Sequence, residues 1–359
     1  MLRPAAGGLY VVSTGLAQQR AVQHRLYGVT TDDDVQRLFA RGLERIASAR
    51  AIVIGVPSDV GAGFLRGANL GPQMVRDALL QDPSYPRFLE EHGIVDIGDV
   101  FVCPQLLHDE MLNEAQIEAS RRAIYPHLDA PARAQLPVSP LSMAERVLDL
   151  VFQLNPRAKP FVIGGDHSTA WPVAAAIARS RRAQDWGIVQ PDAHTDLLAE
   201  RLGVKYCFAT WSYHANDLLG REGRMVQVGT RATRRDRQHW ETTLGVRQFW
   251  AEDCVRDPAR ALDDILAHVK ARKLAGVYFS NDIDGTDEAF ADATGTPEPG
   301  GLHPDFVVEL IRRLGAEIWL LGGDVMEVAP PIERTAGGAS RTLALAARYA
   351  RETLAAMSR

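Results

Sequence analysis

The sequence has few cysteines, no long apolar run and no surplus of positive charge. Cys103, Cys207 and Cys254 are unevenly spaced and odd in number, so we expect no disulfide framework and a reducing compartment. No apolar stretch approaches the length of a membrane span, and Met1–Thr14 lacks the hydrophobic core and cleavage site of a signal peptide. A formal net charge of −5 offers no basic face for nucleic acid. We expect a cytoplasmic protein with neither membrane nor nucleic acid as a partner.

Short apolar runs alternate with helix-like segments along most of the 359 residues. Strands are expected at Ala51–Pro57, Ile94–Gly98, Phe161–Ile163, from Trp186, and at Met225–Gly229, Val246–Trp250, Gly276–Ser280 and Ile318–Gly322. Helices are expected from Thr31 to Ile46, from Gly71, at Leu106–Leu128 and Met143–Leu154, after Thr233, and at Pro258–Lys273 and Gly337–Ala356. This alternation predicts the α/β class, with a mainly parallel sheet covered by helices on both faces.

The N-terminal segment is the least informative part of the chain. Met1–Thr30 has mixed composition and fits either a flexible tail or an arm on a neighbouring subunit. We therefore divide the chain into an N-terminal extension, residues 1–50, and a single domain, residues 51–359.

The most informative stretch begins with the apolar run at Trp186. Asp192, His194 and Asp196 follow it at every second position, where extended chain turns side chains the same way. Two carboxylates and an imidazole around one point are costly to hold together without a cation. A solvated acidic loop with a stray histidine explains this stretch alone equally well.

Two further strand ends repeat the pattern. Phe161–Ile163 leads into a glycine turn that presents His167, and Gly276–Ser280 leads into Asp282 and Asp284. The carboxyl ends of parallel strands open on one crevice, where ligands bind. The candidate metal ligands are His167, Asp192, His194, Asp196, Asp282 and Asp284. This oxygen-rich set without thiolate exceeds the needs of one Zn²⁺ and predicts two divalent ions, Mn²⁺ first and Ni²⁺ or Co²⁺ as alternatives.

Together the motifs resemble the ureohydrolase superfamily of arginases, agmatinases and other guanidino-acid hydrolases. The matching segments, in family order, are Gly164–Ser168, Asp192–Asp196, Ser280–Asp284, Ala293–Leu302 and Asp324–Pro330. Five linked motifs are a strong signal, although each alone would be weak. The resemblance implies an arginase-like, three-layer α-β-α fold and a homo-oligomer, usually a trimer or hexamer.

The resemblance also implies roles for single residues. The six candidates above would hold the two ions, and Asp196 would pass the proton of the attacking water to the leaving nitrogen. Glu327 would bind the substrate guanidinium, whose paired N–H groups match a carboxylate; a solvated loop acid is the alternative. Asp166 and Asp287 would orient ligands, and Thr296 would shape the pocket wall.

One segment departs from the family pattern. Where arginases and agmatinases carry a proton-shuttling histidine, this sequence has Phe208, or Cys207 with a one-residue shift. His214 is the candidate replacement, although a lone histidine at a helix start is more often structural. Phe208 and Trp211 suggest an aromatic wall that binds an apolar substrate tail or stacks on the guanidinium, and burial in the core explains them equally well. The residues that would recognise the amino and carboxylate groups of arginine are not recognisable, which makes arginine a poor candidate substrate.

Two classes of function remain open. The first is a binuclear-metal hydrolase of a linear amidine C–N bond, either agmatinase-like, releasing urea from a guanidino compound, or acting on a formimino compound. The second is a metal-binding member with little catalysis that serves as a binding or assembly subunit. The missing histidine favours the second class, and the complete ligand set with Glu327 opposes it. A single-zinc deacetylase would need fewer ligands than this chain supplies.

Overall fold

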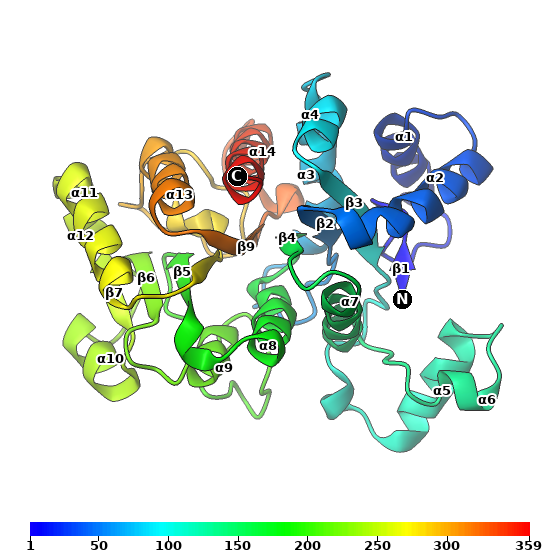
Figure 1. Cartoon of the computed structure of the whole chain (residues 1–359), viewed down its shortest axis with the longest axis horizontal. Helices are drawn as coiled ribbons and strands as arrows, with labels where there is room; N and C mark the ends of the chain where they lie inside the picture. Colours follow the sequence, from blue (N-terminus) through cyan, green and yellow to red (C-terminus); the bar gives the residue numbers. More distant parts are fainter.

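Nine strands form one sheet in this computed structural model, which describes every residue from Met1 to Arg359. They are β1 (Leu2–Arg3), β2 (Ala51–Gly55), β3 (Ile94–Val100), β4 (Lys159–Ile163), β5 (Trp186–Pro191), β6 (Met225–Thr230), β7 (Arg247–Trp250), β8 (Gly276–Phe279) and β9 (Leu320–Val325). Their spatial order is β1-β3-β2-β4-β9-β8-β5-β6-β7 (Figure 1). Every pairing is parallel except that of β1 with β3, which confirms the predicted sheet.

Helices cover both faces of this sheet, so the molecule has three layers. The helices are α1 (Leu16–Tyr27), α2 (Asp32–Glu44), α3 (Gly71–Leu79), α4 (Tyr85–Glu91), α5 (Glu114–Ile124), α6 (Ala130–Arg133), α7 (Pro140–Leu154), α8 (Trp171–Ser180), α9 (Trp211–Leu218), α10 (Arg237–Leu244), α11 (Ala251–Arg256), α12 (Pro258–Ala271), α13 (Pro304–Glu317) and α14 (Gly338–Met357). In Figure 1, α3, α4 and α11 to α14 lie above the sheet, and α7 to α10 lie below it. None of the helices has the length and apolar character needed to cross a bilayer.

The strands supply apolar side chains to both helical layers. In β2, Ala51 and Val53 belong to a core of 41 buried residues shared with α3, α4, α13 and α14. Ile52 and Ile54 belong to a second core of 38 buried residues shared with α7, α8 and α9. Successive strand residues face opposite ways, so a continuous apolar run is what a strand buried on both faces requires.

The N-terminal segment packs on its own chain. Leu2 and Arg3 pair with Val100 and Asp99 of β3, and α2 begins at the predicted cap, where Thr31 Oγ1 accepts from the Asp34 backbone at 3.2 Å. Met1–Thr30 is therefore not a free tail, and an arm that also packs on a neighbouring subunit stays a prediction. The division at residue 50 stays a prediction.

Local side-chain chemistry explains where the predicted helix boundaries are wrong. The helix expected at Leu106–Leu128 is α5 alone, because Asn113 and Gln116 form a capping box that starts it late. The chain continues through the short helix α6, which Asp129 caps. Single-residue caps of this kind set boundaries that apolar periodicity does not reveal.

Arg76, in α3, is a structural residue. Its guanidinium is fully buried and donates to Asp96 Oδ2 at 2.8 Å and to Asp99 Oδ1 at 2.5 Å. Both acceptors are in β3, so this ion pair fastens α3 to the sheet.

Candidate active site and metal centre

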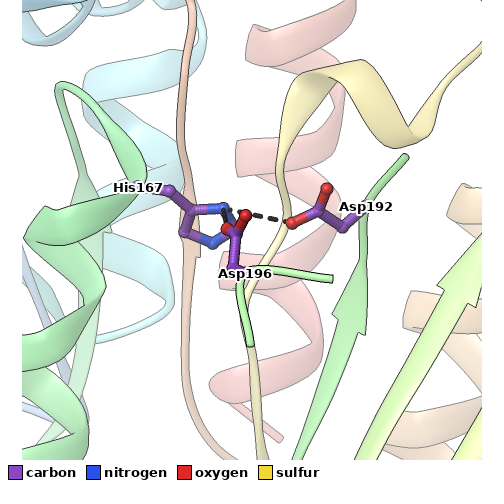
Figure 2. Close-up of side chains that lie close together, drawn as sticks. All are labelled: His167, Asp192 and Asp196. Carbon is purple, nitrogen blue, oxygen red and sulfur yellow. Dashed lines mark ion pairs between the residues drawn. The ribbon is translucent and has the colours of Figure 1, made fainter. Parts of the chain in front are cut away.

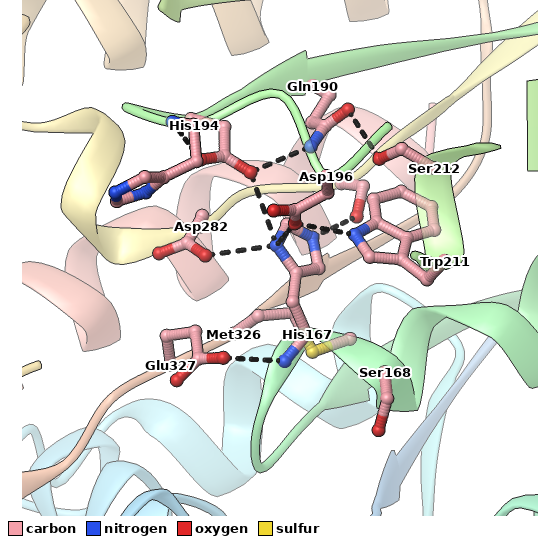
Figure 3. Close-up of polar contacts among 12 residues, drawn as sticks. His167, Ser168, Gln190, His194, Asp196, Trp211, Ser212, Asp282, Met326 and Glu327 are labelled. Carbon is pink, nitrogen blue, oxygen red and sulfur yellow. Dashed lines mark hydrogen bonds and ion pairs between the residues drawn. The ribbon is translucent and has the colours of Figure 1, made fainter. Parts of the chain in front are cut away.

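Four neighbouring strands bring the predicted residues to one edge of the sheet. β4, β9, β8 and β5 are adjacent and parallel, and the predicted ligands follow β4, β5 and β8 while Glu327 follows β9. Carboxyl ends of parallel strands lie at the same edge, and His167 and Glu327, 160 residues apart in sequence, meet there. Figure 3 shows His167, Asp196, Asp282 and Glu327 converging.

The first metal-ligand group surrounds His167. Its Nδ1 lies 2.9 Å from Asp282 Oδ2, 3.4 Å from Asp192 Oδ2 and 3.5 Å from Asp196 Oδ2. His167, Asp192 and Asp196 have ligand atoms within 4.8 Å of one another (Figure 2). All of these side chains are buried.

The second group shares Asp192 with the first. His194 Nδ1 lies 3.1 Å from Asp284 Oδ2 and 3.6 Å from Asp192 Oδ1, and these three residues also have ligand atoms within 4.8 Å of one another. Two adjacent groups joined by one carboxylate are the arrangement that two nearby ions require. The structure brings all six predicted ligands together.

The electrostatics of the cluster fit divalent cations. Burial, reinforced by neighbouring carboxylates, raises the pKa of Asp196 and of Asp282 well above the ordinary value. Burial would lower the pKa of His167, but hydrogen bonds to Asp192 and Asp282 outweigh it and raise the pKa well above its ordinary value. The carboxylates thus require positive charge, and bound divalent ions supply it with oxygen and imidazole donors that suit them.

Asp196 is held by its backbone and by an indole. Its φ is +52°, in the left-handed region that aspartate tolerates better than most residues. Its Oδ2 accepts a hydrogen bond from Trp211 Nε1 at 3.1 Å, and the Trp211 ring stacks on His167 with centroids 4.6 Å apart. Trp211 is fully buried, and it holds Asp196 and His167 in place. It is therefore not part of the aromatic substrate wall that the sequence suggested.

A row of buried glutamines supports Asp192 from the other side. Gln190 Nε2 donates to Asp192 Oδ2 at 2.7 Å, and Gln190 Oε1 accepts from Gln227 Nε2 at 3.0 Å. Gln248 Nε2 donates to Gln227 Oε1 at 2.9 Å, and Trp250 Nε1 donates to Gln248 Oε1 at 3.0 Å. The glutamines occupy paired positions in β5, β6 and β7 and are fully buried. We call Gln190, Gln227 and Gln248 the glutamine row.

The opposite ring nitrogen of His167 is also engaged. His167 Nε2 lies 3.0 Å from Ser280 Oγ, and Ser280 Oγ donates to Asp324 Oδ2 at 2.8 Å. A metal-binding histidine is commonly oriented through its other nitrogen in this way. Sequence reasoning gave no individual role to Ser280, Asp324 or the glutamine row. Asp324 and the glutamines are polar residues inside apolar strands, which was a usable signal.

Glu327 lies beside the cluster with one oxygen engaged. Its Oε1 accepts from the His167 backbone N–H at 2.9 Å, and its φ of +60° turns the side chain inward from the end of β9. Burial, with the charges of Asp282 and Asp166, raises its pKa well above the ordinary value. The other oxygen, Oε2, makes no hydrogen bond within the protein. It lies near Gly295, since a Cβ added to that glycine would be 3.8 Å away.

The remaining predicted residues occupy the surroundings of the cluster. Thr296 Oγ1 donates to Asp284 Oδ2 at 3.0 Å. Asp166 accepts from Gly61 and Ser168 backbone N–H groups, which fixes the turn that presents His167. Asp287 accepts from the Gly301 backbone at 2.8 Å and shapes the loop that follows the ligands.

The structure does not bring His214 into the cluster. Its Nε2 points at the backbone carbonyls of Ala199 and Lys205, at 3.0 and 3.1 Å. Its ring packs among Trp171 and Tyr206, and burial lowers its pKa. His214 as a proton shuttle stays a prediction.

Phe208 lies at a mainly apolar cavity of about 470 Å³. The lining comes from the loops that follow β2, β3 and Asp196, namely Val60–Gly63, Gln105–Leu107, Met111, Leu112, Arg201, Leu202, Val204, Cys207 and Phe208. The Phe208 backbone donates to Gly61 O at 3.1 Å, and Gly61 donates to Asp166. This cavity, the mouth cavity, therefore adjoins the turn that carries His167.

With this geometry, comparison with known proteins assigns the chain. The model of the arginase family matches residues 49–356. This chain belongs to the arginase family. A guanidinobutyrase of Pseudomonas aeruginosa is 30% identical over 295 residues, 79% of this chain and 80% of that protein. The mitochondrial guanidino acid hydrolase of Homo sapiens is 29% identical over 317 residues, 86% of this chain and 78% of its own length.

Solved structures agree with the arginase-family assignment. The proclavaminate amidino hydrolase of Streptomyces clavuligerus superposes with a TM-score of 0.65 at 27% identity, covering 86% of this chain and 91% of its own. The chain is accordingly a ureohydrolase-type hydrolase of C–N bonds in linear amidines. Arginase-family proteins usually hold a binuclear metal centre, and the His and Asp groups of this chain could hold metal.

Proposed function

We propose that this arginase-family protein hydrolyses a guanidino compound to urea and an amine, using two divalent ions, most simply Mn²⁺. The proposal rests on the position of Glu327. Its buried carboxylate lies beside the ligand groups and keeps Oε2 available, and a planar guanidinium matches a carboxylate in shape and charge. The names of the relatives, a guanidinobutyrase and a guanidino acid hydrolase, support the same substrate class.

The ligands would be His167, Asp192, His194, Asp196, Asp282 and Asp284. Two divalent ions there would lower the pKa of a water molecule toward neutrality and orient it. Asp196 would accept the proton of that water, since its Oδ2 faces the cluster and Trp211 fixes its orientation. The water oxygen bonds to the guanidinium carbon, the bond from that carbon to the substituted nitrogen breaks, and Asp196 returns the proton to the departing amine.

Glu327 would position the guanidinium for this attack. Burial keeps the pKa of its carboxyl high in the free protein, so a cationic substrate favours the ionised form as it binds. The paired N–H groups of the guanidinium then set the orientation of the reacting carbon. Substrates without a planar cation lose this contact.

The substrate tail would lie in the mouth cavity. Arg201 lies with its guanidinium 4.9 Å from the Phe208 ring centroid, and its side chain has no carboxylate partner. An apolar lining with one free cation suits an apolar tail that ends in a carboxylate, so we propose a guanidino acid in preference to an amine-ended compound.

A formimino substrate is the second candidate. By the family resemblance, Phe208, or Cys207 with a one-residue shift, stands where arginases and agmatinases carry the shuttling histidine, and relatives that act on formiminoglutamate also lack it. Hydrolysis of a formimino compound by the same attack gives formamide and an amine, without urea.

The test is product release by the Mn²⁺-loaded protein, with Ni²⁺ and Co²⁺ in parallel. Substrates are 4-guanidinobutyrate, agmatine, arginine and formiminoglutamate, and urea and formamide are both measured. Urea from 4-guanidinobutyrate ahead of agmatine supports the proposal. Formamide alone supports the second candidate, and silence on all substrates with two ions bound favours a binding or assembly subunit.

We further propose that the protein acts in the cytoplasm as a homo-oligomer, a trimer or hexamer, and that residues 51–359 form the metallohydrolase domain. The low cysteine content supports the compartment, and the family assignment supports the assembly. Sedimentation velocity of the full chain measures the number of subunits.

A further inference from the structure

A cavity of about 420 Å³ lies at the amino ends of the strands, opposite the metal-ligand groups. Arg50 precedes β2, Lys159 begins β4 and Trp319 precedes β9, and these strands are neighbours in the sheet. Arg157 and the C-terminal Arg359 complete the charged lining. We call it the basic cavity.

The basic cavity has four cationic side chains and no acidic one. No Asp or Glu lies within 4.0 Å of Arg50, Arg157, Lys159 or Arg359, whereas surface arginines elsewhere are commonly paired, as Arg312 is with Glu352. Arg50 Nη1 and Lys159 Nζ reach only the backbone carbonyls of Ser358 and Met357, at 3.3 and 2.5 Å. A concentration of free positive charge on a chain of net charge −5 attracts anions.

Cations grouped in this way repel one another. Burial, with the charge of Arg50, lowers the pKa of Lys159 from 10.5 to about 8. An anion bound between these side chains would relieve that repulsion, and guanidinium groups match phosphate oxygens geometrically.

Trp319 adds a flat aromatic surface to the basic cavity. It is 44% exposed, and Lys159 Nζ lies 3.8 Å from its ring centroid. Its φ of +126° is unusual for a bulky residue, and hydrogen bonds to Leu314 and from Val277, both 3.0 Å, fix its backbone. The indole is thus held beside the cations, where a planar ring can stack on it.

We propose that the basic cavity binds a small ligand that combines at least two phosphate charges with a planar ring, a nucleoside diphosphate or triphosphate. The volume falls in the range of small-ligand sites, about 300–1,000 Å³. Phosphates lie against Arg50, Arg157, Lys159 and Arg359, and the base stacks on Trp319. This site lies at the other edge of the sheet from the cluster and does not depend on the proposed reaction.

The test is calorimetric titration of the metal-loaded full chain with ADP, inorganic pyrophosphate and adenosine at low salt. We expect ADP and pyrophosphate to bind with dissociation constants below 1 mM (about 10⁻³ M) and adenosine not to bind. The double variant Arg157→Gln/Arg359→Gln weakens both anions at least about tenfold. Both arginines are exposed, so the fold is unaffected, which circular dichroism checks.

Arg234→Gln/Arg235→Gln is the matched control, because this pair is also exposed, lies outside the basic cavity and changes the net charge equally. We expect it to leave both affinities within about twofold. Trp319→Leu weakens ADP about tenfold and leaves pyrophosphate unchanged, as loss of one stacking contact predicts. The proposed site would be wrong if the two double variants lost affinity for the anions equally, or if the wild-type protein bound neither ADP nor pyrophosphate. ADP binding that is unaffected by Trp319→Leu would overturn the stacked ring.

Discussion

Trp211 and Asp196, 15 residues apart, are joined by a hydrogen bond from the indole Nε1 to the carboxylate Oδ2. The same indole lies against His167, so one buried side chain fixes two members of the ligand group. The orientation of Asp196, the proposed proton carrier, therefore depends on a residue outside both groups of candidate metal ligands.

Trp211→Phe tests this dependence. Phenylalanine keeps a ring against His167 but lacks the N–H donor, and a hydrogen bond to a charged group contributes about 1.5–3 kcal/mol. We expect kcat to fall roughly 10- to 100-fold with metal content unchanged. Loss of metal along with activity would show that the indole instead supports metal binding.

Glu327→Gln removes the proposed guanidinium partner with little change of shape. We expect kcat/KM to fall at least about 100-fold, because the substrate cation loses a buried, charged hydrogen-bond partner. Thermal stability should hold. Glu309→Gln, an exposed change on α13, is the control and should behave as wild type.

Asp284→Ala should remove metal. Asp284 contacts His194 Nδ1 at 3.1 Å and Thr296 Oγ1 at 3.0 Å, and its loss leaves the second group with two ligands. We expect the dialysed variant to hold no more than one ion by elemental analysis and to lose turnover. Glu309→Gln, an exposed change on α13 away from both groups, should keep its metal. Full metal content in Asp284→Ala would contradict the site assignment.

His214→Asn separates a structural histidine from a proton shuttle. Its ring faces two backbone carbonyls, so we expect kcat to change less than about threefold and the pH profile of kcat to keep its shape. A fall of about 100-fold or more, as loss of a general acid or base gives, would establish the shuttle that the sequence suggested.

Lys159 gives a pH dependence of stability. Its pKa is about 8 in the folded chain against an ordinary 10.5, so above pH 8 the unfolded state binds more protons than the folded one. Burial of the charged side chain therefore costs stability below pH 8, and this cost disappears as the pH rises toward 10.5. We expect the free energy of unfolding of wild type minus that of Lys159→Met to increase between pH 7.5 and 10 in urea titrations. A constant difference would contradict the shift.

The sequence predicted which residues cluster at the carboxyl ends of the strands, because their chemistry is local. A carboxylate or imidazole directly after an apolar strand is visible in the chain itself, and His167, Asp192 and Asp284 lie where that pattern placed them. The side of the sheet that Trp211 faces was not predictable, because stacking on His167 depends on how α9 packs. Arg76 shows the same limit, since its partners Asp96 and Asp99 are known only once β3 lies beside α3.

The packing of the N-terminal segment and the basic cavity could not be predicted from the sequence, for a different reason. β1 has only two residues, too few for any periodicity, and pairs with a strand almost 100 positions away. Arg50, Lys159 and Trp319 come from separate strand beginnings, and only the order of the sheet makes them neighbours.

The hydrogen bonds of the glutamine row all run in one direction from donor to acceptor, and the groups at the two ends of the row set that direction. An indole nitrogen can only donate and an ionised carboxylate can only accept, so Trp250 compels Gln248 to present its carbonyl oxygen, and Asp192 compels Gln190 to present its amide nitrogen. Each amide between them must then point the same way, since turning one over would set two donors or two acceptors face to face. Trp250, on β7 and two strands away from β5, therefore requires the same orientation of Gln190 that Asp192 requires.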